Sequence, residues 1–128
     1  MPVYVIIRHS GSKRDGGFEV AGEWQDISPE ELFKQLEEGR VEPASIIDVR
    51  EQEEWDYYHL PGTRHIAMSV IHESLDDLSK DKEWYVLCAH GVRSMHVCSY
   101  MAGQGYSRLR NITGGIAAAA LLNGFQYD

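Results

Sequence analysis

The chain has 128 residues, a length typical of one domain, and its 43% hydrophobic and 25% charged residues are an ordinary globular balance that excludes a disordered chain. Its formal net charge of -8 and its pI of about 5.1 argue against a surface that binds nucleic acid or an anionic membrane. No apolar run approaches the roughly 20 residues that span a bilayer. The start, "MPVYVIIRHS", has no basic region before its apolar run, so we expect no signal peptide and a cytoplasmic protein.

Residues 1–24 are expected to form an N-terminal extension, a strand or β-hairpin, ahead of a main domain at 25–128. Apolar residues alternate from Val3 to Ile7, as in a half-buried strand, and the turn sequence "GSKRDGG" follows. Residues 18–24 would then return as the second strand. An exposed hairpin edge can pair with another copy of the chain, so we regard a homodimer as possible.

The first helix of the main domain is predicted from "SPEELFKQLEEG". Ser28 can cap it, Pro29 suits its first turn, Glu31 completes a capping-box pattern and Gly39 suits its end. The later elements are a strand in "ASIIDVR", a helical turn and Pro-Gly loop in "EQEEWDYYHLPG", a short strand in "RHIAM", a helix over 70–79, a strand in "EWYVLC", a helix over 94–104, a strand in "LRNI" and a helix in "GGIAAAALLNG". This alternation predicts an α/β domain with a mostly parallel central sheet and helices on both faces.

Cys88 ends the predicted strand "WYVLC", and a helical pattern follows from Ser94. In open α/β sheets, ligands bind beyond the carboxyl ends of the strands. The N–H groups of a loop that enters a helix point inward, and the helix adds roughly half a positive charge at its N-terminus. Arg93 adds a full charge, and Gly91 allows a turn that a side chain would obstruct. These surroundings favour a thiolate, so we expect a nucleophilic Cys88 in an anion-binding loop.

Cys88 and Cys98 are the two cysteines of the chain. Two cysteines are too few for a disulfide framework, and their spacing does not indicate zinc, so we predict no metal and no cofactor. A bridge between them is conceivable, but a reducing compartment disfavours it. Cys98 lies at helical spacing with Met95 and Met101 and is interpreted as a core residue. The alternative is that Cys98 resolves an oxidised Cys88.

Three stretches, in this order, resemble the signatures of rhodanese domains, which are sulfurtransferases. They are "IIDVREQEEWDYYHLPGTRHI", "WYVLCAHGVRS" and "NITGGI". The resemblance extends from about Trp24 to Leu122, most of the chain, and implies a rhodanese-like fold. Family members often have an aromatic residue shortly after Gly-Gly-Ile, where this chain has alanines.

The resemblance implies that Cys88 takes sulfane sulfur from a small anionic donor such as thiosulfate and forms a persulfide. The sulfur then passes to a thiophilic acceptor, which is a thiol, cyanide or a protein. Arg93 would bind the donor anion, and Asp48 and Arg50 would brace the loop without reacting. The residues implied to bind the substrate are Ala89, His90, Gly91, Val92, Arg93 and Ser94.

Two other functions on the same fold remain as alternatives. Four residues separate Cys88 from Arg93, whereas the related cell-cycle dual-specificity phosphatases have five, and the longer loop makes room for a phosphate. Loop length therefore favours sulfur transfer over a phosphatase or arsenate reductase. Some rhodanese-like domains act as binding or regulatory modules without turnover, although these often lack the cysteine.

Several polar residues near the motifs also have plain structural interpretations. His90 is as well explained as a solvent-facing loop residue as by a role beside Cys88, and Asp48 and Arg50 are at least as well explained by pairing with each other. His59 and His65 show no metal-ligand pattern. The acidic residues Glu51, Glu53, Glu54 and Asp56 are expected to form a solvated face.

Overall fold

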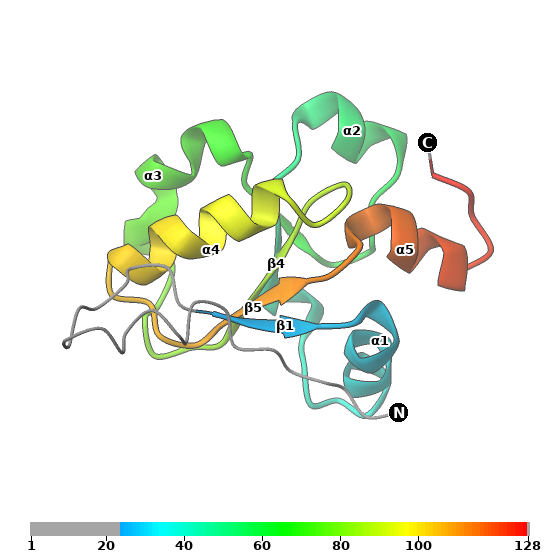
Figure 1. Ribbon diagram of the computed structural model, residues 1–128, viewed down its shortest axis with the longest axis horizontal. Helices are drawn as coiled ribbons and strands as arrows, with labels where there is room; N and C mark the ends of the chain where they lie inside the picture. Colours follow the sequence, from blue (N-terminus) through cyan, green and yellow to red (C-terminus); the bar gives the residue numbers. More distant parts are fainter. Residues whose placement is uncertain (1–23, 128) are drawn as a thin grey trace, which may run out of the picture.

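The computed structural model describes residues 24–127, and in this part of the chain five strands form one parallel sheet in the order β1-β5-β4-β2-β3 (Figure 1). The strands are β1 (Gln25–Ile27), β2 (Ile46–Asp48), β3 (Arg64–His65), β4 (Trp84–Leu87) and β5 (Leu109–Ile112). The predicted hairpin lies almost wholly outside the described residues. Its last residue, Trp24, is buried in the core of the main domain.

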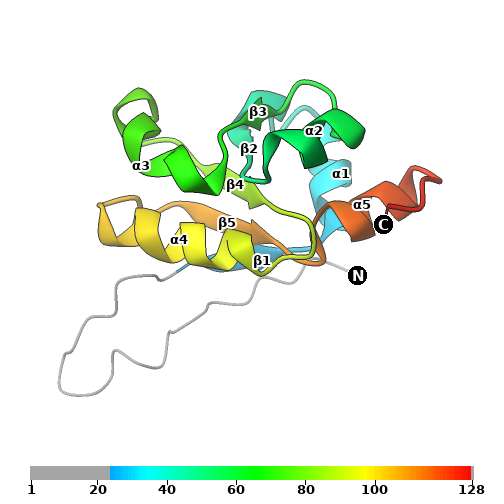
Figure 2. The ribbon, with the colours of Figure 1, turned by 90° about the horizontal axis from the view of Figure 1, so that it is seen from above.

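Helices cover both faces of the sheet, as the alternating sequence pattern predicted (Figures 1 and 2). They are α1 (Pro29–Glu37), α2 (Gln52–Tyr57), α3 (Ile71–Ser74), α4 (Arg93–Gly103) and α5 (Gly115–Leu122). Helices α3 and α4 pack on one face, where Val86, Val97 and Met101 are buried together. Helices α1 and α5 pack on the other face around Leu32 and Ile116. The domain therefore has three layers with the sheet in the middle.

Three of the four capping signals predicted for α1 are confirmed, and the capping box is not. Ser28 accepts a hydrogen bond on its hydroxyl from the Glu31 N–H, at 3.1 Å, and Pro29 occupies the first turn. Gly39 follows the end of the helix with φ of +75°, a conformation that glycine adopts without strain. The Glu31 side chain does not complete the capping box, because it accepts a hydrogen bond from the Gln35 side chain.

Two predicted segments differ from the structure. The expected helix over 70–79 is broken into 3₁₀ turns at Met68–Val70 and Leu75–Asp77 with the short α3 between them. The Leu78 N–H donates to the Leu75 carbonyl at 2.9 Å in a 3₁₀ turn, and the Tyr106 hydroxyl, 2.7 Å from the carbonyl oxygens of both residues, holds this turn in place of a continuous helix. Strand β1 was not predicted, because it has three residues and a polar Asp26 at its centre. No helix in residues 24–127 is both long and apolar enough to cross a membrane.

Candidate functional site

Cys88 immediately follows β4, the central strand of the sheet, and is 1% exposed. The chain then turns through Ala89–Val92 and enters α4 at Arg93. The predicted strand-loop-helix arrangement is thus confirmed, with the thiol at the carboxyl edge of the sheet and at the N-terminus of an 11-residue helix. A sulfur atom in this position meets the positive end of the helix dipole.

Two groups of the loop contact the sulfur atom directly. The Gly91 N–H donates a hydrogen bond to Cys88 Sγ at 3.0 Å, and Ser94 Oγ lies 3.3 Å from Sγ. Gly91 has φ of +95°, and a Cβ at this position would lie 3.1 Å from the Gly114 nitrogen. The backbone can therefore curl over the sulfur only because residue 91 has no side chain.

The first turn of α5 holds the other side of the loop. Ile116 donates its backbone N–H to the Cys88 carbonyl at 2.8 Å, and Ala117 donates to the Ala89 carbonyl at 3.0 Å. Gly115 makes this approach possible, since a Cβ there would lie 2.4 Å from the Cys88 oxygen. Both carbonyls are thus directed to α5, which leaves the N–H side of the loop free to face the sulfur. This contact explains the glycine pair of "NITGGI", for which the residues alone had suggested only a helix start.

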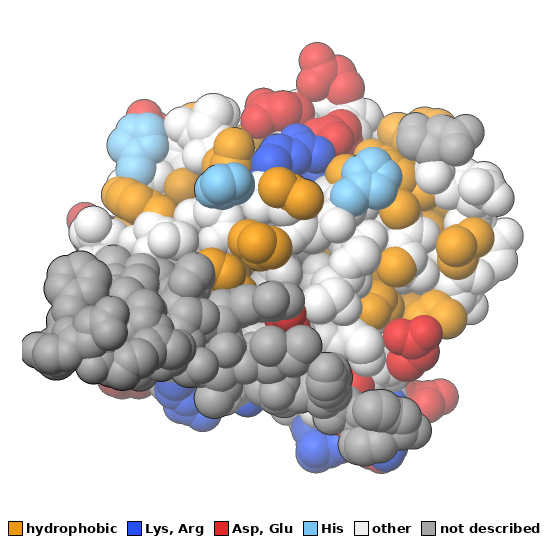
Figure 3. Space-filling model, viewed as in Figure 1, with side chains coloured by type: hydrophobic (Ala, Val, Ile, Leu, Met, Phe, Trp, Pro, Cys, Tyr) orange, Lys and Arg blue, Asp and Glu red, His pale blue; other side chains and the backbone are white. Residues whose placement is uncertain are grey.

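Arg93 forms a two-point ion pair with Glu54 of α2. Its Nη1 and Nη2 donate to the two carboxylate oxygens of Glu54 at 2.9 and 2.8 Å. Hydrogen bonds from Arg93 lower the pKa of Glu54 to about 2, against the opposing effect of burial. Glu54 was predicted to belong to a solvated acidic face. This expectation is wrong, because both oxygens of its carboxylate accept hydrogen bonds from Arg93. Figure 3 shows basic side-chain atoms next to acidic ones, above the start of α4.

Asp48 and Arg50 form a fully buried pair at the end of β2. The guanidinium donates to both oxygens of Asp48, at 2.9 Å from Nε and 2.8 Å from Nη2. Its other N–H groups donate to the carbonyls of Glu54 and Tyr58 and to the Tyr127 hydroxyl. The pKa of Arg50 is raised by its bonds to Asp48 and Tyr127, which outweigh the lowering effect of burial. The pair holds α2, and the Glu54 side chain on α2 reaches Arg93 at the start of α4, so the pair is linked to the Cys88 loop only indirectly.

The remaining loop side chains and Cys98 have no part in these contacts. His90 and Val92 are exposed. Cys98 is fully buried in the core, as predicted, and both cysteines are free. Burial above all raises the pKa of the Cys98 thiol, with smaller contributions from the charges of Asp26 and Cys88. Among residues 24–127 no group of three or more His, Cys, Asp or Glu side chains is arranged to hold a metal ion.

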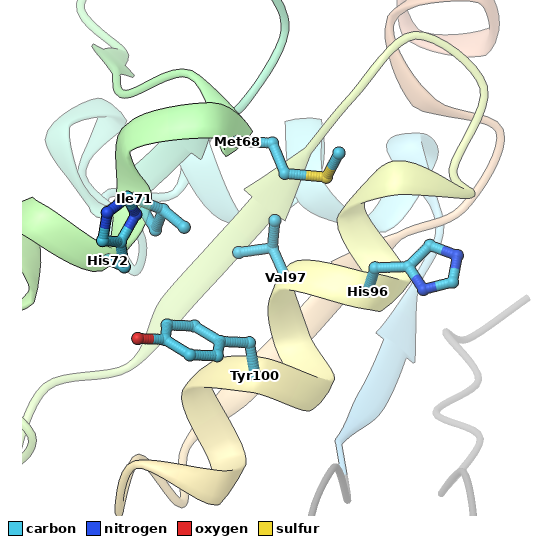
Figure 4. Close-up of a pocket in the computed structure, with 6 residues that line it drawn as sticks. All are labelled: Met68, Ile71, His72, His96, Val97 and Tyr100. Atoms are coloured by element: carbon cyan, nitrogen blue, oxygen red, sulfur yellow. The ribbon is translucent and has the colours of Figure 1, made fainter.

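A groove between α3 and α4 lies on the same face of the sheet as the thiol (Figure 4). Its volume is about 220 Å³, and its lining is mainly apolar with two histidines at its margins. The lining residues are Met68, Ile71, His72, His96, Val97 and Tyr100. Cys88 does not line this groove.

A buried polar pair behind the loop could not be predicted from the sequence. Asp26 of β1 and Asn111 of β5 are paired in register and are 2% and 1% exposed. The Ser94 hydroxyl donates to Asn111 Oδ1 at 2.5 Å, and the Asn111 amide nitrogen lies 3.4 Å from Asp26 Oδ1. A series of polar contacts therefore connects Asp26 on β1, through Asn111 on β5, to the serine that contacts Cys88 Sγ.

The fold and the loop define a class: a parallel α/β domain that places a cysteine at the end of its central strand, beside the N-terminus of a helix. The model of the rhodanese-like domain family matches residues 28–120 of this chain. The chain belongs to the rhodanese-like domain family.

Individual relatives agree with this assignment. The chain is 40% identical over 96 residues to "Putative sulfurtransferase YtwF" of Bacillus subtilis, covering 75% of this chain and 90% of that protein. It is 31% identical to the thiosulfate sulfurtransferase GlpE of Ectopseudomonas mendocina, covering 73% of this chain and 82% of that protein. The crystal structure of a rhodanese-like domain protein from Staphylococcus aureus superposes with a TM-score of 0.67 at 34% identity, covering 73% of this chain and 89% of that one. Family membership supports rhodanese-type sulfur transfer as the general activity.

Proposed function

We propose that the protein is a sulfurtransferase that carries sulfur as a persulfide on Cys88 and uses thiosulfate as a donor. The Cys88 thiolate attacks the outer sulfur of thiosulfate, the S–S bond of the donor breaks, and sulfite leaves with the bonding electrons. An acceptor such as cyanide or a thiolate then attacks the outer sulfur of the persulfide. Thiocyanate or a new persulfide forms, and the Cys88 thiolate is released. The name of the GlpE relative supports thiosulfate as the donor class.

The observation that carries the proposal is the hydrogen bond from the Gly91 N–H to Cys88 Sγ within a loop whose carbonyls face α5. Sγ is negatively charged when it attacks the donor and again when the acceptor releases it, and the outer sulfur of the persulfide is negatively charged between these two steps. The N–H groups of Ala89–Ser94 would stabilise that charge, together with the positive end of α4. Two half-reactions at one thiol predict ping-pong kinetics.

Arg93 would attract the anionic donor while it remains paired with Glu54. A guanidinium has five N–H donors, and two of those on Arg93 reach Glu54. The pair is about one-third exposed, so an approaching anion can reach the arginine. Glu54 would nevertheless weaken this attraction, because its carboxylate cancels the charge of Arg93 at close range. Asp48 and Arg50 would contribute by holding α2, and with it Glu54, in place.

Loop length argues against phosphate hydrolysis, because four residues between Cys88 and Arg93 leave less room for a phosphate than the five of the related phosphatases.

The proposal is tested by the intact mass of the protein after incubation with thiosulfate, before and after cyanide. We expect a gain of one sulfur atom that cyanide removes, and no gain in the Cys88→Ser variant. The Cys98→Ser variant is the matched control and should gain sulfur as the wild type does. If no mass is gained from thiosulfate or from glutathione persulfide, sulfur transfer is rejected in favour of a docking module without turnover.

A further inference from the structure

The buried pair Asp26 and Asn111, behind the Cys88 loop, lies on a face of the sheet that is otherwise mainly apolar. Asp26 and Asn111 are opposite one another on neighbouring strands, on the face of the sheet that α4 covers. The other residues buried on this face include Val86, Val97 and Met101. Burying two polar side chains under a helix is costly unless their hydrogen bonds are made, so their arrangement requires an explanation.

Only one orientation of the Asn111 amide satisfies its surroundings. The side-chain nitrogen lies 3.4 Å from a carboxylate oxygen of Asp26 and 3.5 Å from the Gly91 carbonyl oxygen. Both of these oxygens are acceptors, so a donor must face them. The amide oxygen of Asn111 is consequently directed at Ser94, where it accepts the serine hydroxyl.

This orientation determines the direction of the hydrogen bond at the sulfur atom. A serine hydroxyl has one hydrogen, and in Ser94 it is donated to Asn111 Oδ1. The serine oxygen, 3.3 Å from Cys88 Sγ, is then left with lone pairs toward the sulfur. A hydrogen bond between the two groups forms only if Cys88 carries its proton and donates it to Ser94.

We propose that Asn111, oriented by Asp26, is a positioning residue that makes Ser94 the acceptor of the Cys88 thiol proton and so holds the resting site in the thiol form. When the thiol ionises, two outcomes are open to the Ser94 hydroxyl. It can keep donating to Asn111 Oδ1, so that its lone pair faces the negatively charged sulfur. It can instead donate to the sulfur, which leaves Asn111 Oδ1 without a hydrogen-bond donor. Both outcomes oppose ionisation, against the Gly91 N–H and the helix dipole, which favour it. Because oxidation begins from the thiolate, the arrangement also limits oxidation of the empty site.

Other charged and titratable groups around the sulfur come from three places. Asp26 is on β1, Arg93 and Cys98 are on α4, and His90 is in the loop. The pKa of Arg93 is raised chiefly by its hydrogen bonds to Glu54 and that of Cys98 chiefly by burial, with a smaller contribution from Cys88 to each. A change at Asn111 can alter the field of Asp26 at the sulfur as well as the direction of the serine hydroxyl. The experiment must separate these two effects.

The first measurement follows the S–H stretching band of Cys88 by infrared spectroscopy, in a Cys98→Ala background so that a single thiol remains. We expect the band at the low frequency of a hydrogen-bond donor, and a shift to higher frequency when Ser94→Ala removes the acceptor. An S–H band that Ser94→Ala leaves in place overturns the proposal, because the serine would then be donating to the sulfur.

The second measurement is a double-mutant cycle read by the ultraviolet absorbance of the thiolate as a function of pH. Asn111→Leu keeps roughly the volume of the side chain and releases the Ser94 hydroxyl to donate to the thiolate. We expect it to increase the thiolate absorbance at neutral pH when Ser94 is present. The same substitution should have a much smaller effect beside Ser94→Ala.

An equal increase in thiolate absorbance with Ser94 and with Ser94→Ala would mean that Asn111 acts only through the electrostatic field of Asp26. That result would overturn the proposal. If Asn111→Leu does not fold, the infrared comparison decides by itself, since it needs only the Ser94 and Cys98 substitutions. Both measurements are made without a sulfur donor. Their outcome is therefore independent of the test of sulfur transfer, and either can fail while the other succeeds. Only the protection of the resting enzyme against oxidation rests on the proposed function.

Discussion

Ile116 donates its backbone N–H to the carbonyl oxygen of Cys88 at 2.8 Å, so helix α5 is joined directly to the residue proposed to carry the sulfur. The bond turns the carbonyl of Cys88 away from the site. Since Gly115 precedes Ile116 and touches the same loop, the glycine is the point at which this contact can be tested.

Gly115→Ala is expected to destabilise the protein by at least about 2 kcal/mol and to slow sulfur loading of Cys88. The new Cβ would lie 2.4 Å from the Cys88 oxygen, and φ is +60°. The matched control is Gly39→Ala, which has φ of +75° but no atom within 4 Å of the new Cβ. The control should cost only about 1 kcal/mol and leave loading unchanged. Urea unfolding and intact mass measure the two effects, and equal losses of activity in both variants would contradict the account.

Glu54→Gln is expected to release Arg93 and lower the KM for thiosulfate while it costs about 1 kcal/mol of stability at neutral pH, a small value because the pair is partly exposed. The pKa of Glu54 is lowered from 4.5 to about 2, so its contribution is complete above pH 4.5 and is lost as the pH falls toward 2. The stability difference between wild type and variant should therefore disappear near pH 2. A difference that persists there, or a raised KM, would contradict this role of Glu54.

Asp48→Ala is expected to cost about 3–5 kcal/mol, because it leaves the guanidinium of Arg50 buried without its carboxylate. The double variant Asp48→Leu with Arg50→Met should recover much of the loss, since it removes both charges. Glu38→Gln is the control on an exposed ion pair with Arg40 and should change stability by less than about 1 kcal/mol. Urea unfolding measures all three, and a loss from Asp48→Ala no larger than that of the control would contradict the prediction.

Cys98 is expected to resist alkylation in the folded protein and to react only after unfolding. It is fully buried, and the raised pKa of its thiol keeps it protonated at neutral pH. Peptide mass mapping after iodoacetamide treatment, with and without urea, locates the label. Labelling of Cys98 under native conditions would revive the hypothesis that it resolves an oxidised Cys88.

The parts of the site that are local in sequence were predictable. The end of β4, the turn at Gly91 and the start of α4 lie within seven residues of Cys88 and carry their own signals. Ser28 and Gly39 likewise marked the ends of α1. Each of these predictions needed only the chemistry of neighbouring residues.

The contacts that depend on how distant strands and helices pack together were not predictable. Asp26 and Asn111 are 85 positions apart, and only the pairing of β1 with β5 brings them together. Glu54 and Arg93 are 39 positions apart, and a short acidic helix gives no sign of which carboxylate turns inward. Asp26 is also the reason why β1 was not predicted, because an acidic residue at the centre of a three-residue segment is not typical of a buried strand.

The contact between α5 and the Cys88 loop also sets the order of events during synthesis. Chains are made from the N-terminus, and the residues that hold the carbonyls of Cys88 and Ala89 are Ile116 and Ala117. A nascent chain that has exposed Cys88 but not residue 117 has a cysteine without its finished loop. The Cys88 loop therefore reaches its final form only after α5, the last helix of the described domain, has been made.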